Sequence, residues 1–169
     1  MSTSQASMSE REKRQHRCCF TGHRPEKLTM AEADVISWLE SEIRNAIDEG
    51  FVTFISGMAR GVDIWAAEIV LRLKDEGKQI HLVCASPYEG FESSWSEDWK
   101  RRYNDVLRRA DIVKYVCASY SRACFQIRNE WMVDRSARVI AVYNGEPGGT
   151  RNTINYCRRI GVATIEMKS

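Results

Sequence analysis

The sequence predicts an α/β protein: a Rossmann-like three-layer domain with a mostly parallel sheet of about six or seven strands. Three observations support this prediction. Short β-rich runs alternate with longer amphipathic stretches along the 169 residues. Each strand is followed by enough chain for a helical crossover, which parallel pairing requires. The glycine-rich segments all follow the carboxyl ends of predicted strands.

In the first half of the chain, β-branched, aromatic and cysteine residues predict three strands, at residues 17–21, 51–55 and 79–84. Between the first two strands, apolar residues recur at helical spacing, and Gly50 is the natural stop of that helix. Thr29, with Glu32 three residues later, predicts a capping box at its start. A second helix is expected from about Val62 to Gly77.

The second half continues the alternation. Trp95, Trp99 and Tyr103, spaced four apart, predict a helix, and we expect these rings in the core rather than on a stacking platform for single-stranded nucleic acid. A further helix is expected within residues 122–136, and the last one ends at Ile160. The remaining strands are predicted at residues 111–116, 138–143 and 162–167.

Composition favours one domain. We expect residues 1–15 to form a flexible polar tail and residues 16–169 to form a single Rossmann-like domain, with a hydrophobic fraction of 43% that can build a core. No signal-peptide core and no run of about 20 apolar residues is visible, so we expect a cytoplasmic protein. The six cysteines include no CxxC pair, which favours buried free thiols and predicts no metal site.

Charge gives little support to a nucleic-acid partner. Lys plus Arg is 25 and Asp plus Glu is 23, which leaves a formal net charge of +2. A dedicated nucleic-acid binder usually has a stronger basic excess or a basic stripe. We therefore expect a small-molecule ligand rather than a nucleic acid. We also expect no membrane partner and no cofactor, and we leave a homo-oligomer open.

The segment SGMARGVD is the strongest functional signal, because it lies directly between a predicted strand and helix. Its glycines allow close approach of a ligand, and the free amides at the helix start favour a phosphate. The alternative interpretation is a tight turn with a capping aspartate. It is neither a P-loop nor GxGxxG. The candidate ligand residues here are Ser56, Gly57, Arg60, Gly61 and Asp63.

Three other segments follow strands at the same expected edge of the sheet. In the GGT segment, free amides and a hydroxyl favour phosphate. For this segment alone a turn with a threonine cap is the favoured interpretation, but two such loops at one edge of the sheet favour a site. The TGHRP segment places a histidine and an arginine near the cleft, and an aromatic ring after the third strand could stack on a base or pack under its loop. The candidates are Gly148, Gly149, Thr150, Gly22, His23, Arg24 and Tyr88. Arg128 and Asn129 lie either near the pocket or on a solvated helix face.

The segments TGHRP, SGMARGVD, PYEGF, RNEWMVD and GGT together resemble the YpsA-like family of the SLOG superfamily, which is named after DprA and the LOG cytokinin-activating enzymes. The resemblance covers the chain after the expected tail. It implies a Rossmann-like domain that binds or senses a nucleotide or nucleotide-derived ligand. SGMARGVD resembles the SG-x-ARG-x-D loop of DprA, and GGT resembles part of the LOG sequence PGGxGTxxE.

Two alternatives remain open. The first is a hydrolase that cleaves N-glycosidic or phosphate ester bonds. The LOG-type glutamate is absent, because its position is Thr153, so catalytic residues stay unassigned. The candidate acids and bases are Glu89, Glu97, Asp98, Glu130 and His23. The second alternative is single-stranded DNA binding by analogy with DprA, which the small net charge disfavours.

Overall fold

The computed structural model describes residues 7–169, and it confirms the predicted fold class. Six strands form one fully parallel sheet in the order β4-β3-β2-β1-β5-β6. The strands are β1 (Arg17–Thr21), β2 (Thr53–Ser56), β3 (His81–Ser86), β4 (Ile112–Tyr115), β5 (Arg138–Tyr143) and β6 (Ala163–Lys168).

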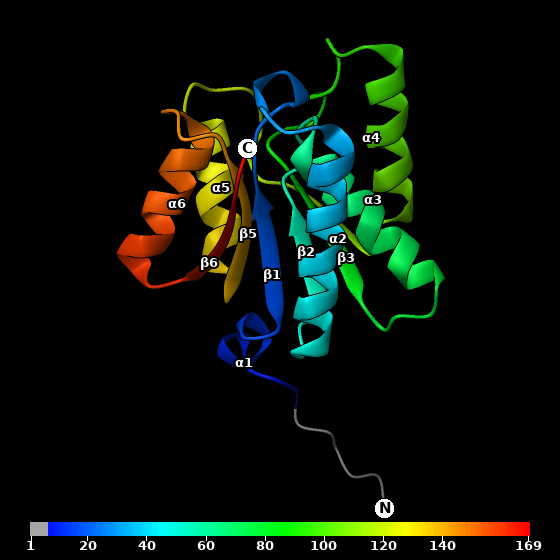
Figure 1. The fold of residues 1–169 in the computed structure, drawn as a ribbon, viewed down its shortest axis with the longest axis vertical. Coiled ribbons are helices and arrows are strands. Elements are labelled where there is room, and N and C mark those ends of the chain that lie inside the picture. Colours follow the sequence, from blue (N-terminus) through cyan, green and yellow to red (C-terminus); the bar gives the residue numbers. More distant parts are fainter. Residues whose placement is uncertain (1–6) are drawn as a thin grey trace, which may run out of the picture.

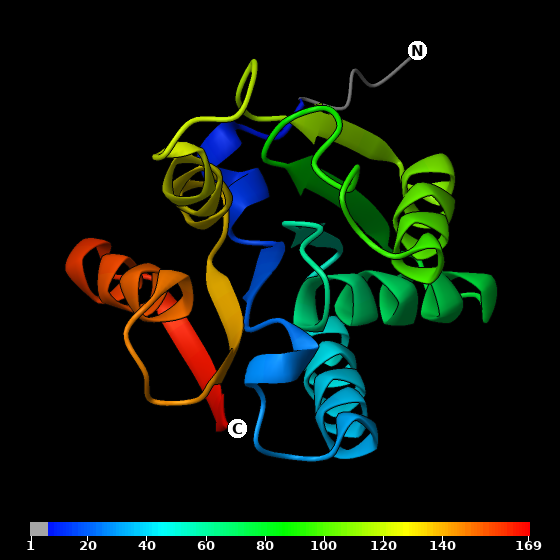
Figure 2. The ribbon, with the colours of Figure 1, turned by 90° about the horizontal axis from the view of Figure 1, so that it is seen from above.

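Helices cover both faces of the sheet, as Figures 1 and 2 show. Helices α2 (Glu32–Asp48), α3 (Val62–Asp75) and α4 (Glu97–Arg109) lie on one face. Helices α5 (Cys124–Asp134) and α6 (Gly149–Ile160) lie on the other face. A short helix α1 (Glu10–Arg14) precedes β1, and a 3-10 turn, η1 (Pro25–Lys27), follows it. Among residues 7–169, no helix combines the length and the apolar character needed to cross a membrane.

The strand order reverses between β1 and β5. From β1 the chain builds outward to β4, and it then returns to β5 and β6 on the other side of β1. The segments after β1 and β5 therefore leave the sheet toward opposite faces, which opens a crevice at the carboxyl ends of these strands. Sheets of this kind bind their ligands in this position.

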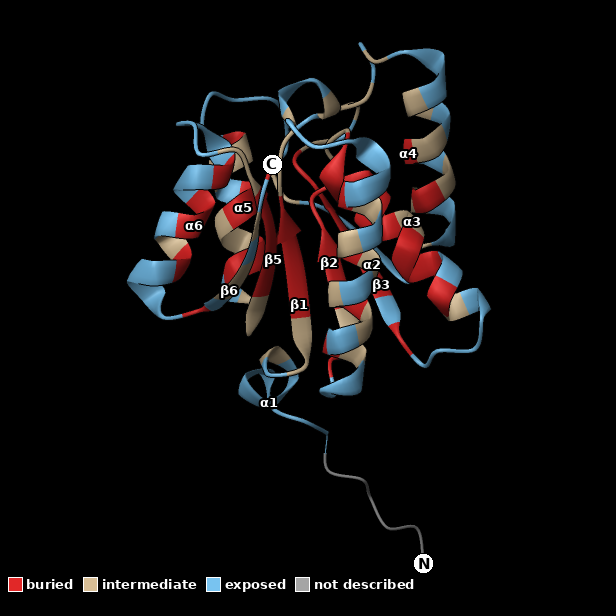
Figure 3. Cartoon of the chain, in the orientation of Figure 1, coloured by how far each residue is buried: buried red, intermediate tan, exposed pale blue. Residues whose placement is uncertain are grey.

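The core has two parts, one on each face of the sheet. Phe20, Phe54 and Leu82 point toward α2, α3 and α4, while Ile55 and Val139 point toward α5 and α6. Figure 3 shows buried residues along the central strands and on the inward sides of the helices. As predicted, the cysteines are free thiols, and all except the half-buried Cys117 are buried.

The start of α2 differs from the prediction. The prediction of a capping box at Thr29 was wrong. Ala31 is the N-cap of α2, and its methyl side chain accepts no hydrogen bond. The backbone N–H of the preceding Met30 donates to the Ser169 hydroxyl at 3.0 Å. Within the expected tail, Ser9 and Glu12 form the capping box of α1. An ion pair from Glu10 to Arg17 holds this helix near β1. Residues 1–6 lie outside the described residues.

Candidate functional site

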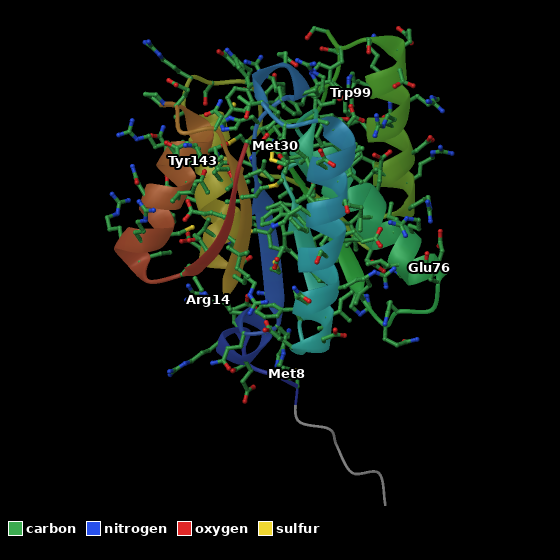
Figure 4. The ribbon with its side chains drawn as sticks, viewed as in Figure 1. Met8, Arg14, Met30, Glu76, Trp99 and Tyr143 are labelled. Atoms are coloured by element: carbon green, nitrogen blue, oxygen red, sulfur yellow. The ribbon has the colours of Figure 1, made fainter. Side chains whose placement is uncertain are left out.

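A cavity of about 970 Å³ opens at the carboxyl edge of the sheet, where the strand order reverses. The segments that follow β1, β2 and β5 line it, together with residues of the connection from β3 to α4 and of α5. Figure 2 looks down on this edge, with the starts of α3 and α6 directed toward the centre. Figure 4 shows Trp99 and Tyr143 near this end of the molecule and Met8 and Arg14 at the opposite end.

The structure brings most of the predicted ligand residues together. Those that line the cavity are Gly22, His23, Arg24, Arg60, Asp63, Gly148, Gly149 and Thr150. They come from three loops that are far apart in sequence. The glycine loops after β2 and β5 therefore share one rim, as the parallel topology requires.

Ser56, Gly57 and Gly61 shape the loop after β2 but do not line the cavity. The Ser56 hydroxyl donates to the Asp63 carbonyl at 2.8 Å and accepts from the N–H of Met58 at 3.2 Å, which folds the loop back on itself. Gly61 has φ +90°, and a Cβ there would lie 2.6 Å from the His23 carbonyl oxygen. Position 61 requires glycine for two reasons. Its φ is positive, and the loop after β1 leaves no room for a side chain.

Arg128 is the basic residue most deeply buried at the cavity, with only 5% of its surface exposed. Its Nε donates to Asn129 Oδ1 at 2.8 Å, and its Nη1 donates to the Gly57 carbonyl. A Cβ at Gly57 would lie 2.9 Å from Nη1, so a glycine is needed for the guanidinium to fit. Burial lowers the pKa of Arg128, whereas the nearby Asp63 carboxylate opposes that shift.

Asp63 lies in the first turn of α3 and is also only 5% exposed. Its Oδ2 accepts from the N–H of Ala59 at 3.2 Å, while Oδ1 is buried without a partner among residues 7–169. Burial raises the pKa of Asp63 to about 6, against the opposing effects of Arg128 and the Ala59 N–H. Asp63 and Arg128 form no direct ion pair, although each comes within 3.0 Å of a Cβ placed at Gly57.

The N-terminus of α6 forms another wall. Gly148 is its N-cap with φ +150°, no side chain caps the helix, and no acidic residue stands in its first turn. The backbone N–H groups of this turn and the helix dipole favour a bound anion. A Cβ at Gly149 would lie 3.9 Å from Nδ2 of Asn129, the residue that holds Arg128.

His23 joins the loops after β1 and β5. Its Nε2 accepts from the backbone N–H of Asn144 at 3.0 Å, so Nδ1 carries the proton of the neutral ring. Burial, followed by the charge of Lys27, lowers the pKa of His23. Asn144 also donates to the Lys27 carbonyl at 3.2 Å. These contacts fix the floor of the cavity and keep His23 neutral.

Basic and aromatic side chains complete the lining. Arg60 pairs with Glu26 at 3.0 Å on the rim, and Arg24 and Lys27 lie close by. Phe91, Trp95, Trp99 and Phe125 provide an aromatic wall. The two tryptophans also pack against the core, as predicted, so they serve both the core and the cavity.

Tyr88 is not among the residues that line the cavity. Its ring makes edge contacts with Phe91, Tyr120 and Phe125, with centroids 5.6, 5.9 and 6.4 Å apart. The packing interpretation of this residue therefore fits the structure better than direct contact with a base.

The candidate acids of the hydrolase hypothesis are also outside the lining: Glu89, Glu97, Asp98 and Glu130. The carboxylates that do line the cavity are those of Asp63 and Glu146.

Several lining residues are not evident from the sequence. It leaves Arg128 and Asn129 open between the pocket and a solvated helix face, and no motif points to Lys27 or Asn144, yet all four line the cavity. One feature of the sequence does point to Arg128 as a buried residue. It lies among apolar neighbours on a helix, one turn before the buried Met132. Charge in the middle of an apolar helix face usually marks a partner or a site.

Comparisons with known structures support the fold. The chain is similar to DNA processing protein A from Helicobacter pylori, which binds single-stranded DNA, with a TM-score of 0.63 and 19% identity over 90% of this chain and 65% of that one. It is also similar to DNA processing protein A from Streptococcus pneumoniae, with a TM-score of 0.65 and 14% identity over 92% of this chain and 51% of that one. At these identities the likeness shows the fold alone.

Sequence comparisons identify the family. The chain is 32% identical over 113 residues to a UPF0398 protein from Halalkalibacterium halodurans, covering 66% of this chain and 60% of that protein. It is 36% identical over 118 residues to the SPbeta prophage-derived protein YoqJ of Bacillus subtilis, covering 63% of this chain and 69% of that protein. The model of the YpsA family, described as the YspA SLOG family, matches residues 18–159. The chain therefore belongs to the YpsA family of SLOG proteins.

Proposed function

We propose that this protein binds a nucleotide or a nucleotide-derived ligand, with its phosphate held between Arg128 and the N-terminus of α6. The observation that carries the proposal is the burial of Arg128 at the cavity without a direct carboxylate contact among residues 7–169. Burying an unpaired guanidinium costs stability unless an anion compensates it. The guanidinium of Arg128 has five N–H donors. Within residues 7–169, Asn129 Oδ1 and the Gly57 carbonyl oxygen accept from two of them, which leaves the others for a ligand.

The other walls of the cavity fit the remaining parts of a nucleotide. The first turn of α6 lacks an acidic residue and faces the same space, so a phosphate there would also receive backbone N–H groups. Trp95, Trp99 and Phe91 form a wall on which a base can stack. The volume of about 970 Å³ is in the range of small-molecule and cofactor sites.

The test is isothermal titration calorimetry with AMP, ADP, NAD and ADP-ribose on the wild-type protein and two variants. Arg128→Lys keeps the charge but loses the planar fork, and we expect it to weaken binding at least tenfold. Arg108→Ala is the matched control, because Arg108 is exposed on α4 and pairs with Asp105. Binding that is equally tight in Arg128→Lys, with its unfolding transition intact, would contradict the proposal, as would a wild-type protein that binds none of the four compounds.

Single-stranded DNA binding is the second candidate, and the fold shared with DNA processing protein A favours it. The cavity combines basic side chains with aromatic rings, the two features that single strands require. Fluorescence anisotropy with a labelled oligothymidine at 50 and 200 mM salt tests it. Salt-sensitive binding that Trp99→Ala weakens would support this candidate, whereas unchanged anisotropy in both buffers would count against it.

We do not extend the proposal to hydrolysis. At the position of the LOG-type glutamate, the Thr153 hydroxyl donates to the Gly149 carbonyl at 2.9 Å and does not line the cavity. Incubation with the same four nucleotides, followed by chromatography, tests this point directly. Release of free base or ribose phosphate would show that another residue supplies the acid or base.

A further inference from the structure

Only one of the two carboxylate oxygens of Asp63 has a hydrogen-bond partner among residues 7–169. Oδ2 accepts from the Ala59 N–H and thereby stabilises the loop before α3. The other oxygen, Oδ1, is buried and unpartnered among the described residues, although Asp63 lines the cavity. A buried carboxylate oxygen without a donor costs stability, and a donor supplied by a ligand would remove that cost.

The position of Asp63 identifies the part of the ligand that it meets. The phosphate end of the cavity is defined by Arg128 and the start of α6, and the aromatic wall is defined by Trp95 and Trp99. Asp63 lies in the first turn of α3, beside Arg128, because both side chains come within 3.0 Å of a Cβ placed at Gly57. In a nucleotide, the sugar adjoins the phosphate and, unlike the phosphate, carries hydroxyl donors. The carboxylate beside Arg128 therefore suits the sugar.

We propose that Asp63 accepts hydrogen bonds from the ribose hydroxyls of the ligand and thereby selects ribonucleotides over 2′-deoxyribonucleotides. This inference rests on the proposed function and names its substrate class. A carboxylate accepts from hydroxyls but repels phosphate oxygens, so it suits the sugar and not the phosphate. A bound 2′-deoxyribonucleotide would leave a buried oxygen of Asp63 without a donor. A site with an unpaired buried polar group discriminates strongly against the ligand that lacks the matching hydroxyl.

The charge state of Asp63 supports this role. With a pKa of about 6, the carboxyl is ionised at pH 7.5 and is an acceptor only. Arg128 is the nearest cationic group, and it faces Asp63 across Gly57 from α5. The Ala59 N–H approaches from the loop before α3. Protonation below pH 6 would remove part of the acceptor capacity and weaken the selection.

The test compares AMP with 2′-dAMP, and ADP with 2′-dADP, by calorimetry at pH 7.5. We expect the wild-type protein to prefer each ribonucleotide at least tenfold, and Asp63→Asn to reduce that preference below threefold. The substituted amide would keep the Ala59 contact through its carbonyl oxygen, so the loop should survive, which thermal unfolding verifies. Glu146→Gln is the matched control, because Glu146 is the other carboxylate at the cavity, and it should keep the full preference.

The outcomes separate the two proposals. A wild-type protein that binds both members of each pair equally would overturn the role of Asp63 and leave the nucleotide site standing. Loss of the preference in Glu146→Gln but not in Asp63→Asn would overturn it as well. A wild-type protein that binds none of the four compounds would overturn both the site and this inference.

Discussion

His23 Nε2 accepts a hydrogen bond from the backbone N–H of Asn144, 3.0 Å away across 121 positions of sequence. This contact joins the loop after β1 to the loop after β5 at the point where the strand order reverses. Because an imidazole nitrogen accepts only when it is unprotonated, the floor of the cavity depends on a neutral His23.

We expect His23→Ala to lower the free energy of unfolding by about 1–2 kcal/mol at pH 8, since it leaves the Asn144 N–H without its acceptor. Burial lowers the pKa of His23 in the folded state. The hydrogen bond of neutral His23 therefore stabilises the fold fully above about pH 6.5, and this stabilisation is lost as the pH falls below that value. Urea unfolding at pH 8 and pH 5.5 should show a smaller difference between variant and wild type at the lower pH.

His81→Ala serves as the control for this prediction, because His81 is exposed at the start of β3, at the other edge of the sheet. If the two alanine variants show the same dependence on pH, the contact between His23 and Asn144 does not stabilise the fold in the way described.

Two glycines with nearly equal φ angles should respond differently to alanine. Gly61 has φ +90° and Gly145 has φ +88°. A Cβ at Gly61 would lie 2.6 Å from the His23 carbonyl oxygen, whereas no described atom lies within 4 Å of one at Gly145. We expect Gly145→Ala to cost about 1–2 kcal/mol, from its left-handed backbone alone. Gly61→Ala should cost about 3 kcal/mol or more, because a backbone atom must also move. Equal midpoints of urea unfolding for the two variants would refute this assignment.

Asp63 should make the folded state less stable as the pH rises. Its pKa in the folded protein is about 6, above the value of about 3.9 in an unfolded chain. The folded state therefore holds the proton more tightly, and the advantage is lost between about pH 4 and pH 6. The free energy of unfolding of the wild type, minus that of Asp63→Asn, should fall by about 2 kcal/mol from pH 4 to pH 7. Urea titrations at four pH values measure this difference.

Asp111→Asn is the control. For this variant, the difference in the free energy of unfolding from the wild type should change with pH in the opposite direction. Burial acts against ionisation of Asp111, but hydrogen bonds from Lys74 and the Leu82 N–H lower its pKa overall. A lowered pKa stabilises the folded state above the unfolded pKa and ceases to do so as the pH falls. The difference between wild type and Asp111→Asn should therefore rise with pH. If the free energy of unfolding of the wild type, minus that of Asp63→Asn, also rises with pH, the pKa of Asp63 is not raised in the folded state.

An acid placed at the start of α6 should stabilise the protein and weaken its ligand binding. Arg151 is exposed in the first turn of α6, which lacks acidic residues. Arg151→Glu should raise the free energy of unfolding by about 0.3–1 kcal/mol through the helix dipole. The same charge should repel a bound phosphate and reduce the affinity for AMP severalfold.

Arg108→Glu changes the net charge equally at the far end of α4, so it should leave the affinity for AMP nearly unchanged. Unaltered affinity in Arg151→Glu would mean that the phosphate does not bind at the start of α6.

Much of the fold was predictable because its signals are local. Alternating strand and helix patterns predicted the parallel sheet, and the positions of SGMARG and GGT after strands predicted that both loops meet at one edge. The start of α2 was misplaced because Thr29 and Glu32 match a capping box in sequence, whereas the N-cap is Ala31. Next to it, the Met30 N–H donates to Ser169 near the far end of the chain, and a local pattern cannot reveal such a contact.

Periodicity and the rules of parallel sheets are enough to derive the fold class, the edge of the sheet that carries the site and the loops that line it. They do not reveal which side chains are deprived of water, and that became visible only in the packed molecule. Arg128 is buried because α5 packs its first half against the loop at Gly57, and Asp63 has a raised pKa because that loop covers it. Desolvation depends on every neighbour in three dimensions, and a spacing of residues along the chain cannot specify it.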